Sequence, residues 1–305
     1  MGTDISVGIG GSGRRAARVA VLALLWGSTF LWIRLALDGL APVQVTFIRC
    51  ALGAAVLVAG CRRKGLRLPR DRAVWGRLVI AAFFCNALPF ALFSLAERSV
   101  GSGVAGALGA TTPLWSVLIG IVIGTEHGLR LARSAGLVLG FAGTLLIYAP
   151  WQRGQLASWG ALAVLAAAAG YAVAFVFMRR TLVGTGLPTL SLSAAQLLAA
   201  TGWSALTLPA GGLEWPRGGP GALISVVVLG VFATGITFHL TFRIIADEGA
   251  TDAATVGYLL PVVSLTLGAI VLDERLGLRI ATGMSVVLVG VALTRRRRAV
   301  QPTNE

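Results

Sequence analysis

Ten apolar segments, separated by short polar stretches, recur along this 305-residue chain. A helix needs about 20 predominantly apolar residues to cross a bilayer, and a segment in lipid must satisfy its own backbone hydrogen bonds, which a helix does. The sequence therefore predicts an all-α polytopic membrane protein with ten transmembrane helices. The segments, bounded to within about three residues, are Val19–Leu37, Val43–Gly60, Leu78–Leu95, Val104–Gly124, Arg133–Ala149, Trp159–Met178, Leu190–Leu208, Leu223–Ile245, Ala253–Leu272 and Ile280–Thr294.

The composition excludes the other common classes of protein. Hydrophobic residues make up 56% of the chain and charged residues only 12%, whereas a soluble domain carries about 25% charged residues. Such high hydropathy also excludes a disordered chain. The three cysteines, Cys50, Cys61 and Cys85, lie in or beside apolar segments, so we expect small core residues rather than a disulfide framework or a metal cluster. No cofactor is expected.

The net charge of +14 does not indicate nucleic-acid binding, because the basic residues lie between apolar segments rather than on one polar face. Lys and Arg are retained in cytoplasmic loops, and most of them fall in alternate connections if the amino terminus lies inside. The even number of predicted spans then places both termini in the cytoplasm. The basic residues are Arg apart from Lys64, which together with the abundant Ala and Gly indicates a GC-rich bacterial genome. We therefore expect the protein in a bacterial plasma (inner) membrane.

The second half of the chain repeats residues of the first half, which is the pattern of an internal duplication. Residues of the same type recur at constant spacing, mainly 148 positions apart. At an offset of 148, Gly101, Gly109, Pro113 and Glu126 match Gly249, Gly257, Pro261 and Glu274; at 147, Gly136 and Gly143 match Gly283 and Gly290; at 145, Trp26, Phe30 and Arg34 match Tyr171, Phe175 and Arg179.

Each half holds five predicted helices, and because five is odd the second half enters the membrane inverted. Inverted repeats are typical of secondary transporters, whose substrate sites lie at the repeat interface. We expect residues 1–17 to form a flexible cytoplasmic tail, 18–150 the first repeat, 151–298 the second repeat and 299–305 a second cytoplasmic tail. Because the first helix has a partner in the sixth, its removal as a signal peptide is not expected.

Several of these residues, in this order, resemble the EamA domains of the drug/metabolite transporter superfamily. They are Trp26-Gly27-Ser28, Arg49, Pro113 followed by Glu126, and Tyr258-Leu259-Leu260-Pro261 followed by Glu274. The resemblance covers Ala17 to Arg295 in two copies. It implies ten helices, a central cavity, alternating access and often the export of amino acids or other small metabolites. Tyr171 stands where a Trp is common in that family, which leaves ligand details open.

The two repeat-related prolines, Pro113 and Pro261, are candidate hinges. A proline in a helix removes a backbone donor and frees the carbonyl four residues earlier, which here belongs to Gly109 and Gly257 respectively. Each proline could act as a hinge of the cavity wall, and a static kink filled by neighbouring side chains is the alternative.

Aromatic and polar residues near the prolines form the candidate substrate-binding set. Polar groups in a membrane bundle face protein or water rather than lipid. Singly each is explained by helix-to-helix hydrogen bonding, but as a set from both halves they favour a binding cavity. Arg49, inside the second predicted helix, could attract a substrate carboxylate or clamp structural partners such as Glu97. The set is Trp26, Arg49, Asn86, Thr112, Tyr171, Thr234 and Tyr258.

Other groups have narrower candidate roles. His239 is the one histidine inside an apolar segment; it could couple protons or be a hydrogen-bonded core residue. Glu126 and Glu274 close their segments and are expected to cap helices or pair with arginines. Gly136 and Gly140 form a GxxxG step that permits close helix contact, either within one protomer or in a homodimer.

These observations predict a secondary-active transporter that exports a small metabolite, such as an amino acid or amphipathic compound, by alternating access. A non-transporting membrane scaffold or sensor is the first alternative. A membrane-embedded enzyme is the last, because the chain has no HExxH or GxSxG motif and no ATP-binding loop. A GxGxxG match at Gly8–Gly13 lies in the tail without a βαβ unit, so it does not indicate a dinucleotide site. The partners expected are a small-molecule substrate and the lipid bilayer.

Overall fold

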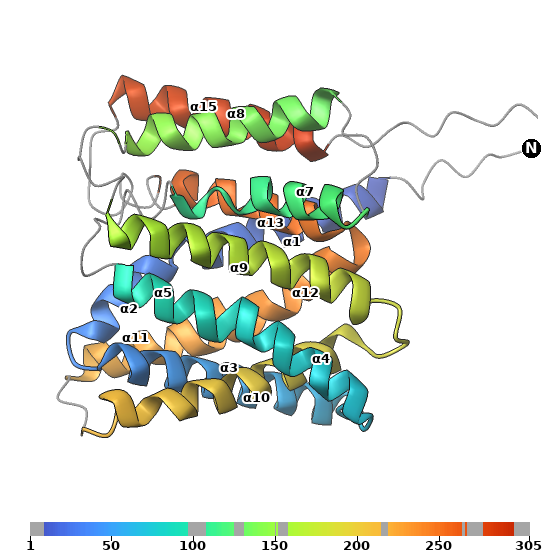
Figure 1. The fold of residues 1–305 in the computed structure, drawn as a ribbon, viewed down its shortest axis with the longest axis vertical. Coiled ribbons are helices and arrows are strands. Elements are labelled where there is room, and N and C mark those ends of the chain that lie inside the picture. Colours follow the sequence, from blue (N-terminus) through green and yellow to red (C-terminus); the bar gives the residue numbers. More distant parts are fainter. Residues whose placement is uncertain are drawn as a thin grey trace, which may run out of the picture.

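The chain folds into a bundle of helices whose axes run roughly in one direction (Figure 1). A computed structural model describes residues 9–96, 108–124, 131–149, 151, 158–214, 219–263, 266 and 277–295, and the regular secondary structure of these residues is helical. The protein is therefore an all-helical membrane protein, in agreement with its apolar segments. Four helical stretches are long and apolar enough to cross a membrane: Pro42–Arg63, Arg72–Phe93, Trp159–Thr181 and Pro220–Asp247.

The described helices follow the apolar segments closely. The first half contains α1 (Ile9–Gly27), α2 (Thr29–Leu37), α3 (Pro42–Arg63), α4 (Arg72–Ala82), the π-helical turn η1 (Phe83–Ala87), α5 (Leu88–Ala96), α7 (Thr112–Val122) and α8 (Leu131–Tyr148). The second half contains α9 (Trp159–Thr181), α10 (Thr189–Thr207), η3 (Leu208–Ala210), α11 (Pro220–Gly230), η4 (Val231–Ile236), α12 (Thr237–Asp247), α13 (Ala250–Thr255), η5 (Val256–Tyr258) and α15 (Leu278–Arg295).

The start of the chain differs from the sequence prediction in two ways. Helix α1 begins at Ile9, so residues 9–17, which were expected to belong to a flexible tail, are helical. Hydropathy marks only the part of a helix that lies in lipid, and the Ala and Arg residues before that part favour a helix themselves. The first apolar segment is also interrupted at Ser28, where α1 ends and α2 begins.

Local sequence signals fix the beginnings of several helices. At the start of α3, Pro42 occupies the first turn and the Gln44 side chain accepts the Ala41 N–H at 2.9 Å. At the start of α4, the Asp71 carboxylate accepts the Ala73 N–H at 2.8 Å. Side-chain acceptors and proline are favoured there because the first N–H groups of a helix lack partners within it.

Two π-helical turns interrupt otherwise continuous helices at equivalent positions of the two halves. Turn η1 begins at Phe83 and turn η4 begins at Val231, 148 residues later. A π turn re-aims the side chains around it and is frequent at functional sites. Nothing in the apolar pattern of the two segments indicates these turns, so sequence reasoning missed them.

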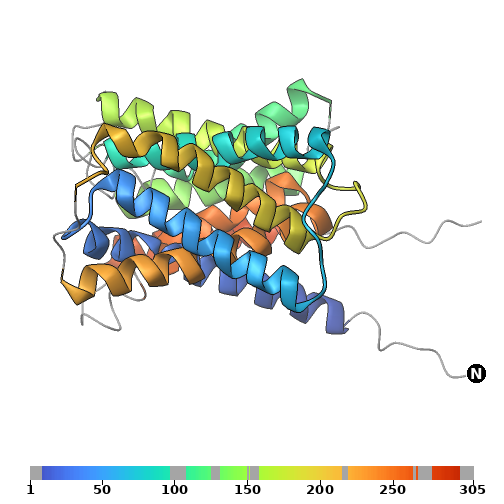
Figure 2. The same cartoon turned by 90° about the horizontal axis from the view of Figure 1, so that it is seen from below.

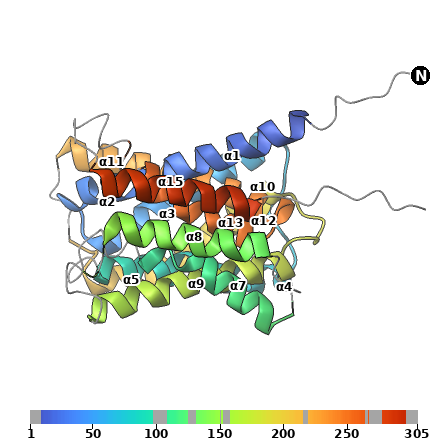
Figure 3. The same ribbon diagram turned by 90° about the horizontal axis from the view of Figure 1, so that it is seen from above.

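Helices α8 and α15 lie side by side at one edge of the bundle (Figure 3). Glycines permit this close contact. A Cβ added to Gly136 would lie 2.6 Å from the Gly290 carbonyl oxygen, and one added to Gly143 would lie 2.8 Å from the Gly283 carbonyl oxygen. These glycines therefore contact each other within one chain, at pairs that are reciprocal under the 147-residue offset, as a two-fold relation requires.

Helices α3 and α10 form the opposite edge and run side by side when the bundle is seen from below (Figure 2). They are the second predicted helices of the two halves, as α8 and α15 are the fifth. Both edges of the bundle thus consist of one helix from each half. Most of the remaining helices, including α5, α9 and α12, lie between these two edges (Figure 1).

Arginines connect the two halves at the end of the bundle that was predicted to be cytoplasmic. Several of their guanidinium groups donate to carbonyl oxygens at helix carboxy-terminal ends, where a positive charge is favourable. The contacts between the halves are Arg77 with Thr181 at 3.0 Å, Arg180 with Ile123, and an ion pair between Arg18 and Asp247. Arg179 makes a similar contact with Ile245 at 3.0 Å within the second half.

Candidate functional site

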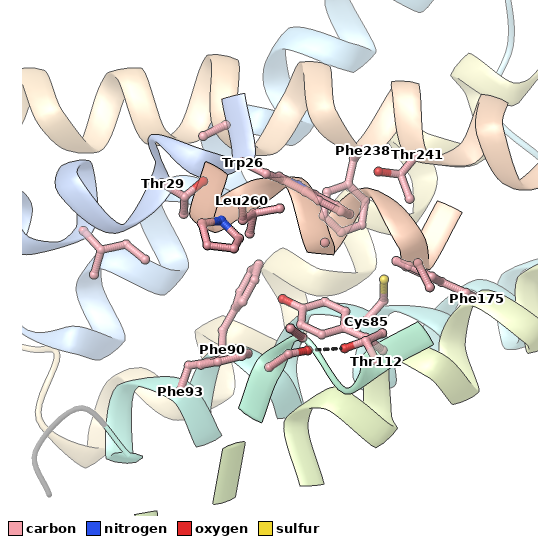
Figure 4. A pocket seen from close by; sticks show the side chains of 18 of the residues that line it. Trp26, Thr29, Cys85, Phe90, Phe93, Thr112, Phe175, Phe238, Thr241 and Leu260 are labelled. Carbon is pink, nitrogen blue, oxygen red and sulfur yellow. Dashed lines mark hydrogen bonds between the residues drawn. The ribbon is translucent and has the colours of Figure 1, made fainter. Parts of the chain in front are cut away.

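A cavity of about 160 Å³ lies between the two halves of the bundle. Figure 4 shows Trp26, Leu260 and Phe238 on one side of it and Phe90 and Thr112 on the other. Its wall is mostly aromatic and aliphatic. The lining residues are Trp26, Thr29, Ile33, Arg49, Cys85, Phe90, Phe93, Gly109, Ala110, Thr112, Tyr148, Tyr171, Phe175, Ala233, Phe238, Thr241, Ala254, Gly257, Leu260 and Pro261.

Much of the lining comes in pairs of residues from equivalent positions of the two halves. Four of the six pairs below have different side chains, so the cavity is symmetric in backbone and asymmetric in chemistry. At the offset of 148 the lining pairs are Cys85 with Ala233, Phe90 with Phe238, Phe93 with Thr241, Gly109 with Gly257 and Thr112 with Leu260, and at 145 Trp26 pairs with Tyr171.

Arg49 brings a positive charge to this wall. Its side chain on α3 is 6% exposed, its Nε donates a hydrogen bond to Thr234 Oγ1 at 3.0 Å, and its guanidinium carbon lies 4.0 Å from the centre of the Phe90 ring. The bond to Thr234 and the cation–π contact offset part of the cost of burying the charge. The partners of Arg49 in the structure are therefore a hydroxyl and an aromatic ring. Glu97, the partner considered from the sequence, lies outside the described residues.

The other half holds a neutral counterpart of the bond between Arg49 and Thr234. Gln196 on α10 lies 147 residues after Arg49, and Asn86 lies 148 residues before Thr234. Gln196 Nε2 donates to Asn86 Oδ1 at 3.3 Å, and both side chains are fully buried. Each bond joins the second helix of one half to the π turn of the other. Asn86 and Thr234 thus lie in helix contacts and do not line the cavity.

The first candidate hinge is an interruption of the helix. Gly109 is helical, residues 110 and 111 form a turn, and α7 then begins with Thr112 and Pro113. The Gly109 carbonyl, which the proline leaves without its usual donor, accepts a bond from Thr112 Oγ1 at 2.8 Å (Figure 4). Gly109 and Thr112 line the cavity, whereas Pro113 does not.

The equivalent position in the second half is also irregular. Gly257 lies in the 3₁₀ turn η5 between α13 and a further helical stretch at residues 259–263 that contains Pro261. Both Gly257 and Pro261 line the cavity. The two proline positions therefore share an interruption of the helix beside the cavity, which is the geometry a hinge needs.

The remaining candidate residues lie elsewhere. Tyr258 is fully buried, donates to the Leu137 carbonyl at 3.2 Å and packs against Gly140, so it belongs to the contact with α8. His239 on α12 does not line the cavity, and its buried Nδ1 has no hydrogen-bond partner among the described residues. Glu126 and Glu274 lie outside the described residues.

A second cavity of about 30 Å³ adjoins the first. It is lined by Ile33, Leu37, Pro42, Val45, Thr46, Arg49, Phe90 and Phe93. Four of these residues, Ile33, Arg49, Phe90 and Phe93, line both cavities and so form the wall between them. This wall faces the end of the bundle where α2 ends and α3 begins.

The sequence profile of the EamA-like transporter family matches residues 17–149 and 158–296. The chain belongs to the EamA-like transporter family. Among similar members, the uncharacterized transporter YvbV of Bacillus subtilis is 24% identical over 94% of this chain and 93% of its own. The uncharacterized inner membrane transporter YedA of Escherichia coli is 24% identical over 89% of this chain and 87% of its own.

The fold of this family member also agrees with a solved structure. One crystal structure of a protein, 23% identical in sequence, superposes with a TM-score of 0.75 and covers 93% of this chain and 96% of that one. The family and the names of its members point to a membrane transporter rather than an enzyme.

The sequence predicted some of the residues that line the cavity and missed the others. Trp26, Arg49, Thr112 and Tyr171 line it as expected from the sequence, together with three of the four hinge residues. The phenylalanines were missed because an apolar segment gives no signal for which face lines a cavity. The 148-residue offset, applied to every position, would have paired Phe90 with Phe238.

Proposed function

We propose that this transporter is a secondary carrier of a bacterial inner membrane that exports a small amphipathic metabolite, such as an amino acid, by alternating access. The observation that carries the proposal is the cavity between the halves, with its wall built from equivalent residues of both. A site on the interface of two inverted repeats can face either side of the membrane when one repeat rocks against the other.

The proposal includes ten membrane-spanning helices in two inverted five-helix repeats, with both termini in the cytoplasm. It is supported by the two regions that match the family profile and by contacts that are reciprocal between the halves, at the glycines of α8 and α15 and at the two buried polar bonds. The arginine contacts at one end of the bundle agree with the retention of basic residues in the cytoplasm.

The geometry favours a closed cytoplasmic end in this conformation. Arg18 on α1 pairs with Asp247 on α12, and Arg180 on α9 donates to the Ile123 carbonyl after α7. Both contacts join the first half to the second, so they must break for the cavity to open to the cytoplasm. At the other end, the wall that contains Arg49 and the two phenylalanines must move for release of the substrate.

The test is counterflow in liposomes that contain the purified protein. Vesicles are loaded with an unlabelled amino acid or aromatic carboxylate, and uptake of the same labelled compound is measured without any gradient of ions. We expect Phe238→Ala to slow the exchange because Phe238 lines the cavity, and Phe232→Ala to leave it unchanged because Phe232 lies outside the lining and is 46% exposed.

Failure of every amino acid, aromatic carboxylate, sugar and cationic drug to exchange, with the protein still folded by size-exclusion chromatography, would overturn the proposal. Binding of such a compound without exchange would favour a membrane scaffold or sensor instead. If Phe238→Ala and Phe232→Ala slowed exchange equally, the substrate would not pass through this cavity.

His239 is the candidate for coupling export to a proton gradient. Its Nδ1 is buried and has no partner in the part of the chain that the structure describes. The residue lies outside the cavity wall, so its replacement should spare the substrate site. In His239→Asn, counterflow should persist while stimulation by a pH gradient is lost. Stimulation equal to that of the unaltered protein would assign His239 a packing role only.

A further inference from the structure

We infer that the cavity selects a monoanionic aromatic compound, a ring with one carboxylate, over zwitterionic and cationic compounds of the same shape. The inference rests on the proposed function and narrows it, because it assigns to the same cavity one class of amphipathic metabolite and ranks amino acids, which are zwitterions, below that class. It depends on three features of the wall: the donors of Arg49, the absence of acidic lining residues, and the size and aromatic character of the space.

The guanidinium of Arg49 offers unused donors beside the cavity. Its Nε bonds to Thr234, and its two Nη nitrogens have no hydrogen-bond partner among the described residues, yet they are not among the fully enclosed unpartnered atoms. Arg49 lines both the main cavity and the smaller one beside it, so a ligand in the cavity can approach its guanidinium. A planar guanidinium matches a carboxylate with two parallel bonds, so an anion can satisfy the donors that the protein leaves open.

The bond to Thr234 and the ring of Phe90 hold the guanidinium in place before a ligand arrives. A preorganised charge loses little freedom on binding, and its hydrogen bonds are stronger in a site that excludes water. The repeat-related position holds the neutral Gln196, which lies outside the lining. The positive charge is thus at one point of an otherwise symmetric cavity.

No Asp or Glu lies among the described residues that line the cavity. An ammonium group placed beside Arg49 would lose its hydration and meet a like charge, with no opposite charge among these residues, which is costly. A cation–π contact with the aromatic wall offsets only part of this cost. The Gly109 carbonyl at this wall already accepts a hydrogen bond from the Thr112 hydroxyl. A compound that carries an ammonium group is therefore disfavoured, whether as a cation or as a zwitterion.

The remaining space fits one aromatic ring. Trp26, Phe90, Tyr171, Phe175 and Phe238 contribute ring atoms to the wall of a cavity of about 160 Å³. An engineered apolar cavity of about 150 Å³ in another protein binds benzene. Aromatic walls favour offset or edge-to-face contacts with a bound ring.

The test is equilibrium binding to the full-length protein in nanodiscs, with labelled phenylacetate and three competitors of matched shape. 2-Phenylacetamide has nearly the same atoms without the charge, phenylglycine adds an α-ammonium group, and benzylamine carries only the cation. Phenylacetate should bind at least about tenfold more tightly than 2-phenylacetamide, the difference expected for hydrogen bonds to a charged group. Phenylglycine and benzylamine should compete more weakly still.

Variants of two arginines test whether Arg49 causes the preference for the carboxylate over the neutral amide. Arg49→Gln should abolish the difference between phenylacetate and 2-phenylacetamide, whereas Arg67→Gln, at an exposed arginine outside the cavity, should retain it. If Arg49→Gln fails to fold, the ligand series on the unaltered protein still decides. Binding of 2-phenylacetamide, phenylglycine or benzylamine as tightly as phenylacetate would overturn the inference, as would no measurable binding of phenylacetate.

Counterflow with the same compounds separates this inference from the proposed function. Exchange of benzylamine or phenylglycine in preference to phenylacetate would leave the transporter proposal intact and overturn the anion assignment. Tight, Arg49-dependent binding of phenylacetate without exchange would support the anion site and overturn transport.

Discussion

Arg49 Nε lies 3.0 Å from Thr234 Oγ1, and this bond joins the second helix of one half to the π turn of the other. The equivalent bond runs from Gln196 to Asn86 at 3.3 Å. The two bonds are related by the same offsets that relate the glycines of α8 and α15. The first bond involves a charged residue that lines the cavity, whereas the second joins two neutral, enclosed side chains. The two halves therefore share the backbone arrangement and differ in the side chains at these positions.

The first prediction concerns Thr234→Val, which keeps the shape and removes the acceptor of Arg49. Because a buried charged donor then loses its partner, the free energy of unfolding should fall by about 1–2 kcal/mol. Phenylacetate binding should weaken as well, since the guanidinium is no longer held. Denaturation in mixed micelles and the nanodisc binding assay measure the two effects.

Thr237→Val is the matched control. The Thr237 hydroxyl donates only to carbonyls of its own turn, at Ala233 and Thr234, so its removal should cost less than about 0.6 kcal/mol and leave binding unchanged. Equal losses of stability and binding in the two variants would contradict a special role of the bond between Arg49 and Thr234.

The second prediction concerns the contact between α8 and α15. A Cβ on Gly290 would overlap the Gly140 backbone nitrogen, so Gly290→Ala should destabilise the fold by about 1–3 kcal/mol or more, as overpacking does. Gly202→Ala is the control, because a Cβ there meets nothing within 4 Å and alanine favours a helix by up to about 1 kcal/mol.

Thermal unfolding of the purified variants measures this difference. If Gly290→Ala leaves the stability of the protomer unchanged and alters only the oligomeric state in a native gel, then the glycine surface would serve a homodimer rather than the contact within one chain.

Much of the fold and part of the site follow from the sequence, for identifiable physical reasons. Lipid requires apolar helical segments, so hydropathy locates the helices, and the glycine and proline spacing locates the duplication. The π turns at Phe83 and Val231 are not predicted from the sequence, because a shift of backbone register does not change the apolar pattern of a segment. The location of Tyr258 was not predicted correctly for a related reason. Its ring and hydroxyl suit either a cavity or a helix contact, and its packing against Gly140 assigns it to the helix contact.

The third prediction concerns the ion pair between Arg18 and Asp247. The two side chains are 21% and 41% exposed, so Arg18→Ala should change stability by no more than about 1 kcal/mol. Because the pair joins the halves at the end proposed to be cytoplasmic, its loss should raise the reactivity of a cavity thiol toward reagents added from that side. Arg15→Ala, at an exposed arginine of the same helix, should have no such effect, and an equal rise in both variants would refute the closing role.

The fourth prediction separates a hinge from a static kink. In Pro113→Ala, a backbone N–H becomes available and the first turn of α7 can continue into the preceding helix. If the interruption is a hinge, exchange in liposomes should slow while equilibrium binding of substrate stays the same. Unchanged exchange together with unchanged binding would assign Pro113 a static kink, and Pro261→Ala provides the same comparison in the second half.

The central claim is that the cavity between the halves opens in turn to each side of the membrane, and two repeat-related thiols test it most directly. Cys85 lines the cavity and serves as the first probe once Cys50 and Cys61 are replaced by Ala; Ala233→Cys with Cys85→Ala provides the second at the equivalent position. A membrane-impermeant thiosulfonate is added to oriented proteoliposomes from either side. The account predicts that both thiols react from both sides and that transported substrate slows the reaction. Reaction from one side only, or reaction that substrate does not slow, would contradict it.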